Sequence, residues 1–188
     1  MQKFLRFVAK GLRILLDRLR TQGLRTTLVW VWGRGFPKLT GIPLVRYSQI
    51  TPELYVGGQY GARGKRKLER LGVTGGVNMR IEFDDAAHGL ALADYCHLPT
   101  VDDAAPTLDH LHEGAAFTRR VIDGGGKVYI HCAGGVGRAP TMAAAYLITQ
   151  GMTLDDAIAL IKQHRPFIRI MPPQIDQLRQ FEAEHRKS

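Results

Sequence analysis

The segment KVYIHCAGGVGRAPTMAAAYLI (127–148) constrains the fold of this chain more than any other. Its first six residues are mainly β-branched and aromatic, which predicts a buried strand over 127–132. A five-residue loop with three glycines follows (133–137), and an apolar run predicts a helix from Pro140 to Gln150. Such a loop between a strand and a helix is a ready anion site, because the first amides of a helix lack intrahelical partners.

Two residues give this loop a chemistry beyond anion binding. Arg138 supplies a planar guanidinium group that matches two phosphate oxygens. Cys132 would lie at the floor of the loop, where the same amides favour the thiolate over the thiol and create a nucleophile. His131 is expected to hold the loop by hydrogen bonds rather than to act as a base. The predicted phosphate-binding residues are Ala133, Gly134, Gly135, Val136, Gly137 and Arg138.

Charge is distributed unevenly along the chain. Residues 1–46 contain ten lysines and arginines and one acid, whereas residues 47–188 contain sixteen residues of each sign. Apolar and basic residues alternate at helical spacing from Phe4 to Leu19, which predicts a basic amphipathic helix. We therefore divide the chain into a basic N-terminal arm (1–46) and a catalytic domain (47–188). The arm suits an anionic membrane surface or a partner protein, and the neutral domain argues against nucleic acid.

The remaining sequence predicts an α/β fold. Strand patterns alternate with helix patterns throughout residues 47–188, which indicates a central, mostly parallel sheet flanked by helices on both faces. Two cysteines are too few for a disulfide framework, so we expect thiols in a reducing, cytoplasmic compartment. No cluster has the spacing of metal ligands, and neither a GKS/T nor a GxGxxG motif is present, so no metal or cofactor is expected.

The stretch HCAGGVGR (131–138) resembles the signature of the dual-specificity branch of the cysteine-dependent protein tyrosine phosphatases. ITPELYVGG (50–58) resembles the opening strand of that family, and LPTVDDAAPT (98–107) its general-acid loop. Residues 127–150 and IRIMPPQIDQL (168–178) are similar to the mitochondrial phosphatases that act on phosphatidylglycerophosphate. The resemblance implies a tyrosine-phosphatase-like fold, hydrolysis of phosphomonoesters through a cysteinyl-phosphate, and, in a eukaryote, a mitochondrial location.

The resemblance also implies roles for residues outside the loop. Asp102 would be the general acid, with Asp103 as the alternative, and Gln174 would orient water unless it is an exposed residue at a helix start. Ala139 stands where most relatives carry Ser or Thr. The missing hydroxyl predicts slower breakdown of the phosphoenzyme, unless the hydroxyl of Thr141 replaces it.

Three further expectations concern substrate and regulation. We expect a dual-specificity protein phosphatase. Loop residues 133–137 carry no basic side chain, which argues against a polyphosphorylated head group as the substrate. The alternative is a membrane-associated lipid phosphatase, which the basic arm favours, and lower-ranked readings are a phosphoglucan phosphatase and a non-catalytic phosphate-binding module. Cys96 could form a reversible disulfide with Cys132, or be an inert core residue.

Overall fold

The computed structural model describes residues 20, 23 and 47–186. The chain divides between Leu44 and Val45, and the unit that follows this division is described here by itself. The predicted amphipathic helix at Phe4–Leu19 and most of the basic arm lie outside the described residues.

A five-stranded sheet forms the centre of the domain, with the order β1-β2-β5-β3-β4. Its strands are β1 (Tyr47–Gln49), β2 (Leu54–Gly58), β3 (Val73–Arg80), β4 (Asp94–Thr100) and β5 (Lys127–Cys132). Strands β2, β5, β3 and β4 are parallel, and β1 pairs antiparallel with β2 at the edge. The prediction of a mostly parallel sheet is confirmed, and the buried strand 127–132 occupies its middle.

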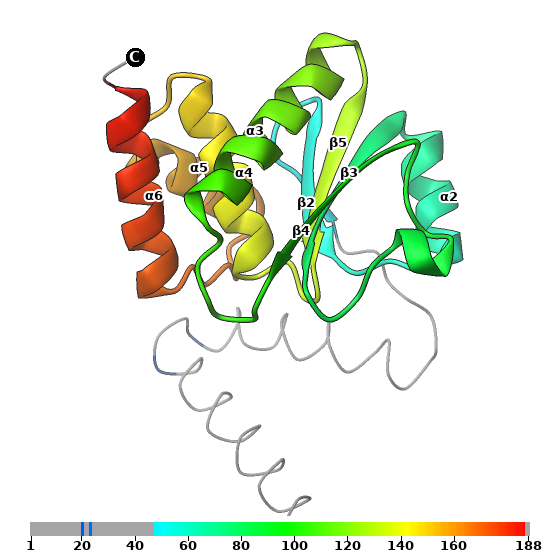
Figure 1. Cartoon of the computed structure of the whole chain (residues 1–188), viewed down its shortest axis with the longest axis horizontal. Helices are drawn as coiled ribbons and strands as arrows, with labels where there is room; N and C mark the ends of the chain where they lie inside the picture. The colour runs from blue at the N-terminus through cyan, green and yellow to red at the C-terminus, as the bar shows by residue number, and fades with distance from the viewer. Residues whose placement is uncertain (1–19, 21–22, 24–46, 187–188) are drawn as a thin grey trace, which may run out of the picture. The chain divides into compact units, whose positions relative to one another are not determined.

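Helices cover both faces of this sheet (Figure 1). The helices are α2 (Ala62–Arg70), α3 (Leu108–Asp123), α4 (Arg138–Thr149), α5 (Leu154–His164) and α6 (Pro172–His185). Helix α2 lies on one side, whereas α3 to α6 lie on the other. A short 3-10 turn, η1 (Ala86–His88), lies in the loop after β3. Among these elements, none combines the length and the apolar character that a membrane-crossing helix requires.

Helix starts follow local capping chemistry. The Thr153 side chain accepts a hydrogen bond from the Asp156 amide at the start of α5, as a Thr cap residue does. Helix α4 begins at Arg138, two residues before the predicted start at Pro140. Proline is tolerated in a first helical turn because its missing N–H would have no intrahelical acceptor there. The early start carries Arg138 into the helix and places its first amides at the glycine loop.

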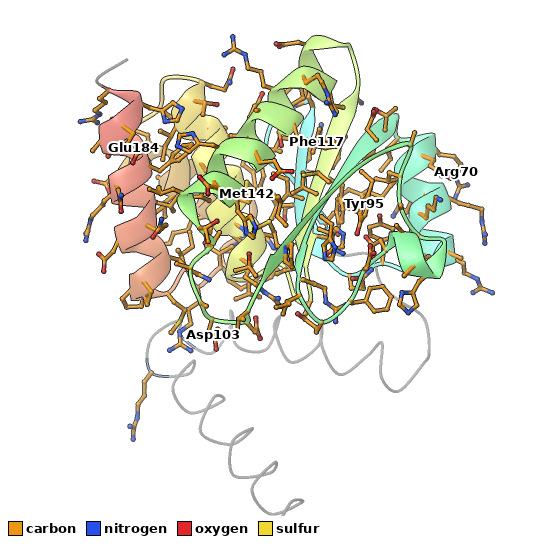
Figure 2. The ribbon with its side chains drawn as sticks, viewed as in Figure 1. Arg70, Tyr95, Asp103, Phe117, Met142 and Glu184 are labelled. Atoms are coloured by element: carbon orange, nitrogen blue, oxygen red, sulfur yellow. The ribbon has the colours of Figure 1, made fainter. Side chains whose placement is uncertain are left out.

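The central helix α4 packs tightly against its neighbours. Ala143, Ala144 and Ala145 are fully buried, and their small side chains let the helix approach the sheet closely. At the crossing with α3, a Cβ added to Gly114 would lie 2.4 Å from the Met142 sulfur, so a larger residue there would require the Met142 side chain to move. Met142 is labelled at this crossing in Figure 2. Because α4 is fixed on both sides, the loop that precedes it is held in place as well.

Candidate active site

The candidate site lies where the parallel strands end. The loops after β2, β3, β4 and β5 all leave the sheet at its carboxyl edge, the usual position of ligand sites in α/β folds. The loop after β5, residues 133–137, connects directly to the N-terminus of α4. Four loops that are separated in the sequence therefore begin at the sheet edge where Cys132 ends β5.

Four successive carbonyl groups of the β5–α4 loop are held from outside. The carbonyl of Ala133 accepts from the Gln59 amide at 3.3 Å, and that of Val136 accepts from the Arg169 amide at 2.8 Å. Between them, the carbonyls of Gly134 and Gly135 accept from the Arg165 guanidinium. In a trans peptide the next N–H points opposite to the carbonyl. The amides of residues 134–137 therefore turn inward and form an anion-binding cradle.

Cys132 lies at the base of this cradle. Its side chain is buried, and the Gly135 amide donates a hydrogen bond to its sulfur at 3.2 Å. Gly135 has a left-handed backbone (φ +63°), and a Cβ there would come within 2.4 Å of the Gly57 carbonyl group. Only glycine can bring this amide to the sulfur without moving β2. The hydrogen bond is the contact through which the loop reaches the sulfur, and the preference for the thiolate form stays a prediction.

Arg138 is almost fully buried at the start of α4. Its Nη1 donates to the carboxylate of Glu82 and to the Thr100 carbonyl, both at 2.8 Å, and its Nη2 donates to Glu82 at 2.9 Å. Its Nε is also buried, and it has no hydrogen-bond partner among the described residues. This arrangement fixes the plane of the guanidinium and leaves one donor for a phosphate oxygen.

Glu82 is the carboxylate that holds this arginine. Hydrogen bonds from Arg138, with a further hydrogen bond from Arg80, lower the pKa of Glu82 to about 2. Partial burial of Glu82 acts in the opposite direction, but its effect on the pKa is smaller. Burial alone would lower the pKa of Arg138, but the bond to Glu82 outweighs it and raises the pKa. Glu82 thus stays ionised in neutral and mildly acidic solution, and the pair is lost only as the pH falls toward 2.

A second buried pair lies beside the nucleophile. The His131 Nε2 is 2.7 Å from the Asp85 Oδ2, and both side chains are fully inaccessible to solvent. Burial opposes ionisation of Asp85, but His131 outweighs it and holds the pKa of that carboxyl below its usual range. Asp85 also accepts from Gln59, which in turn accepts from Arg80. His131 thus contacts the segment after β3 rather than residues 133–137, and its role in holding the loop stays a prediction.

The two candidate acids occupy different positions on the β4–α3 loop. The Asp102 carboxylate lies 3.1 Å from the Arg138 Nη2, and its side chain is otherwise well exposed. Asp103 has a left-handed backbone (φ +65°) and is labelled on this loop in Figure 2. A phosphate bound by Arg138 would therefore lie within reach of Asp102, and the assignment of Asp102 as the acid, with Asp103 as the alternative, stays a prediction.

Gln174 is fully buried at the start of α6, so the alternative of an exposed helix-start residue is wrong. Its Oε1 accepts from the Met171 amide and its Nε2 donates to the Ala104 carbonyl, each at 2.9 Å. A Cβ added to Gly137 would lie 3.4 Å from the Gln174 side-chain oxygen, so the side-chain amide of Gln174 lies next to the last residue of the cradle. Gln174 thus connects the β4–α3 loop, which carries Asp102 and Asp103, to α6. Its role in orienting a water molecule stays a prediction.

Ala139 and Thr141 lie in the first turn of α4. Ala139 is fully buried. The Thr141 hydroxyl donates to the Gly137 carbonyl at 2.9 Å, within its own helical turn. Because that hydrogen is used on the backbone, Thr141 does not replace a hydroxyl at position 139.

Cys96 is separated from Cys132 by the sheet itself. Val77 of β3 pairs with Cys96 on one side and with Ile130 on the other, so two strand spacings, roughly 9.5 Å, separate β4 from β5. A disulfide requires Cα atoms within about 7 Å, so the predicted disulfide is wrong for this fold. Burial, with Glu113 nearby, raises the pKa of Cys96 to about 12, which makes it an inert core thiol.

Sequence reasoning missed the charged side chains that support the site. Glu82, Asp85 and Arg165 all contact the cradle or its flanking residues, but none belongs to the 131–138 segment. One signal was present for the first two, because EFDD (82–85) follows a strand that ends at the same sheet edge. Arg165, by contrast, is one of several basic residues near the end of a helix, and the sequence does not distinguish it.

Known proteins are similar to this chain in sequence. Residues 54–184 match the family model of the dual specificity phosphatase catalytic domain. Human dual specificity protein phosphatase 1 is 32% identical over 138 residues, which cover 72% of this chain and 37% of the relative. Human dual specificity protein phosphatase 26 is 34% identical over 128 residues, which cover 64% of this chain and 60% of the relative. The chain thus spans about a third to three fifths of the length of these relatives.

Solved structures give the same result. The crystal structure of PTPMT1 in complex with PI(5)P has a TM-score of 0.70 and 30% sequence identity, and it covers 75% of this chain and 97% of that one. The crystal structure of human DUSP28 has a TM-score of 0.67 and 25% identity, with 75% of this chain and 99% of that one covered.

Proposed function

Because the chain belongs to the dual-specificity phosphatase family, we propose that it hydrolyses phosphotyrosine, phosphoserine and phosphothreonine esters in proteins. One observation carries the proposal: the Gly135 amide bonds the Cys132 sulfur, in a loop whose four carbonyls are all held by other segments and which leads directly to Arg138, whose Nε has no partner among the described residues. Such an array binds a phosphate dianion and neutralises the charge of its transfer. A non-catalytic module would need the cradle but not the sulfur or the nearby Asp102.

In the first step, the Cys132 thiolate attacks phosphorus in line with the leaving oxygen. The phosphorus–oxygen bond breaks, a sulfur–phosphorus bond forms, and the Asp102 carboxyl gives its proton to the departing oxygen. The amides of residues 134–137 and the Arg138 guanidinium hold the three equatorial oxygens throughout. Arg138 can do so without moving, because Glu82 already fixes its orientation.

In the second step, water hydrolyses the cysteinyl-phosphate. The Asp102 carboxylate formed in the first step takes a proton from the water, which attacks phosphorus and releases inorganic phosphate and the thiolate. No hydroxyl at position 139 helps the sulfur to leave, and the Thr141 hydroxyl is used by the backbone. The breakdown step is therefore the slower one in this proposal.

The two aspartates provide a matched test of the proposed chemistry. We expect Asp102→Asn to lower kcat/KM for phenyl phosphate, which reports formation of the phosphoenzyme, by about 10²- to 10³-fold, because phenolate needs a proton to leave. The loss should be smaller for p-nitrophenyl phosphate, whose leaving group is stable without one. Asp103→Asn should change either rate by no more than about twofold, because asparagine also tolerates a left-handed backbone. A larger effect of Asp103→Asn would transfer the acid role to that residue.

A specific observation favours a second candidate, hydrolysis of a phosphomonoester lipid in a membrane. Ile81 and Val101 are 56% and 57% exposed, the two large apolar side chains most open to solvent in the part of the chain described. Arg80 pairs with Thr100 across β3 and β4, so the residues that follow them leave the sheet side by side. Ile81 directly precedes Glu82, and Val101 directly precedes Asp102. The carboxylates of Glu82 and Asp102 both contact Arg138.

This apolar pair supports contact with the acyl region of a bilayer, and two further features agree with it. PTPMT1 has been crystallised with PI(5)P, and the arm of residues 1–46 carries the net positive charge that anionic lipids attract. In this candidate function the protein would act at the membrane surface as a peripheral protein.

Vesicles separate the two candidates. We expect the Ile81→Ser, Val101→Ser double variant to lose about tenfold in turnover of phosphatidylglycerophosphate in phosphatidylglycerol vesicles, because each apolar side chain loses its burial in lipid. Turnover of soluble p-nitrophenyl phosphate should be preserved, and deletion of residues 1–46 should act in the same direction. Equal turnover of lipid by wild type and double variant, with faster turnover of phosphopeptides, would exclude the lipid candidate.

A further inference from the structure

Arg165 reaches the cradle from outside the signature segment. It follows α5 at its C-terminus and is only 2% exposed. Its guanidinium lies 4.5 Å from the ring centre of Phe167, and its Nη1 is 3.4 Å from the Ser48 hydroxyl oxygen on β1. These neighbours hold the planar group in one orientation behind the loop.

The guanidinium contacts two successive loop carbonyls. Its Nε donates to the Gly135 carbonyl at 2.5 Å, and its Nη2 donates to the Gly134 carbonyl at 3.1 Å. Both bonds come from one rigid fork, so the two peptide planes are fixed relative to each other. They are the middle two of the four outward carbonyls, and backbone amides hold the outer two.

The inward amides depend on this outward contact. The peptide after Gly134 carries the Gly135 amide, which donates to the Cys132 sulfur, and the peptide after Gly135 carries the Val136 amide. Gly135 alone would not keep this orientation, because a glycine with a left-handed backbone has other conformations at similar energy. A flipped peptide would place a carbonyl oxygen in the cradle and repel both thiolate and phosphate.

We propose that Arg165 is a positioning residue for catalysis, which orients the Gly135 and Val136 amides toward the Cys132 thiolate and the substrate phosphate. It acts through the loop and does not touch the substrate. The buried positive charge on the outer side of the loop has the same effect, since it favours a negative charge within the cradle. The proposal rests on the proposed function only for the identity of the anion.

Arg165→Lys tests the role of the fork, because lysine keeps the charge but offers a single ammonium group. We expect kcat/KM for p-nitrophenyl phosphate to fall about 10- to 100-fold, with most of the loss in kcat. We also expect weaker inhibition by vanadate, and alkylation of Cys132 by iodoacetamide should require a higher pH than in the wild type. Arg165→Met, without the charge, should show larger changes in all three measurements.

Ile161→Ala is the control for a purely structural effect. Ile161 is fully buried on the same helix, and its carbonyl accepts from the Arg165 amide, but its side chain belongs to the hydrophobic core. Measured below its melting temperature, this variant should keep the wild-type kcat/KM, vanadate inhibition and alkylation profile. Wild-type values of all three in Arg165→Lys, with only a lower melting temperature, would overturn the proposal.

A second variant and two measurements that need no turnover complete the test of Arg165. If Arg165→Lys does not fold, Ser48→Ala removes one tether of the guanidinium, and it should shift the same three measurements in the same direction to a smaller extent. No shift in a folded Ser48→Ala variant would then count against the proposal. Vanadate binding and alkylation need no turnover, so they report on Arg165 even if the proposed substrates are wrong.

Discussion

Cys132→Ser is expected to abolish hydrolysis of p-nitrophenyl phosphate, with kcat reduced by about 10⁵-fold or more, the scale seen when a nucleophile is removed. A serine hydroxyl needs a base to become a nucleophile, whereas the Gly135 amide, which bonds the sulfur at this position, can only donate a hydrogen bond. The cradle amides would still be present in the variant. Binding of inorganic phosphate, measured by calorimetry, should therefore persist.

The same experiment distinguishes the enzyme from a phosphate-binding module. If the wild type is as inactive as Cys132→Ser while both bind phosphate, the module is the correct interpretation. Cys96→Ser is the matched control, because its thiol is buried beside Glu113 and away from the cradle. It should retain wild-type turnover.

Arg138→Lys is expected to lower kcat/KM for p-nitrophenyl phosphate by about 10³-fold. The lysine ammonium cannot bond Glu82 and the Thr100 carbonyl and still present a donor to phosphate in the position of the Arg138 Nε. Loss of a single donor to the charge that develops in a transition state costs about 10²- to 10³-fold, and this variant loses the orientation as well. Steady-state kinetics and thermal melting of the purified variant provide the measurement.

A double-mutant cycle with Glu82→Gln shows whether Glu82 acts through Arg138. If it does, Glu82→Gln alone should lower kcat/KM, and it should add little to the effect of Arg138→Lys. Losses that multiply in the double variant would mean that Glu82 contributes to catalysis independently. Both residues lie in one hydrogen-bond network with Arg80, so the cycle should be run on variants with confirmed folding.

Local patterns in the sequence predict the centre of this fold well. The strand 127–132, the glycine loop and the apolar helix are consecutive, so propensity and spacing define them without reference to distant residues. The cap at Thr153 and the parallel sheet follow in the same way. The start of α4 differs because proline in a first turn is compatible with an earlier beginning at Arg138.

The supporting charges could not be predicted, because they depend on which strands become neighbours. Glu82 is 56 residues from Arg138, and Arg165 is 30 residues from Gly135. The strand order places β3 beside β5, and this order brings Glu82 and Asp85 to the cradle. It also separates Cys96 from Cys132, which a sequence without strand order cannot reveal.

The rate of Cys132 alkylation by iodoacetamide as a function of pH is the most direct test of the cradle, measured in the Cys96→Ser protein with and without vanadate. If the loop amides and Arg138 hold the sulfur as a thiolate, the rate should reach half its maximum below about pH 7, and vanadate should block the reaction. A midpoint near roughly 8.5, the value of an ordinary cysteine, with no protection by vanadate, would contradict the account.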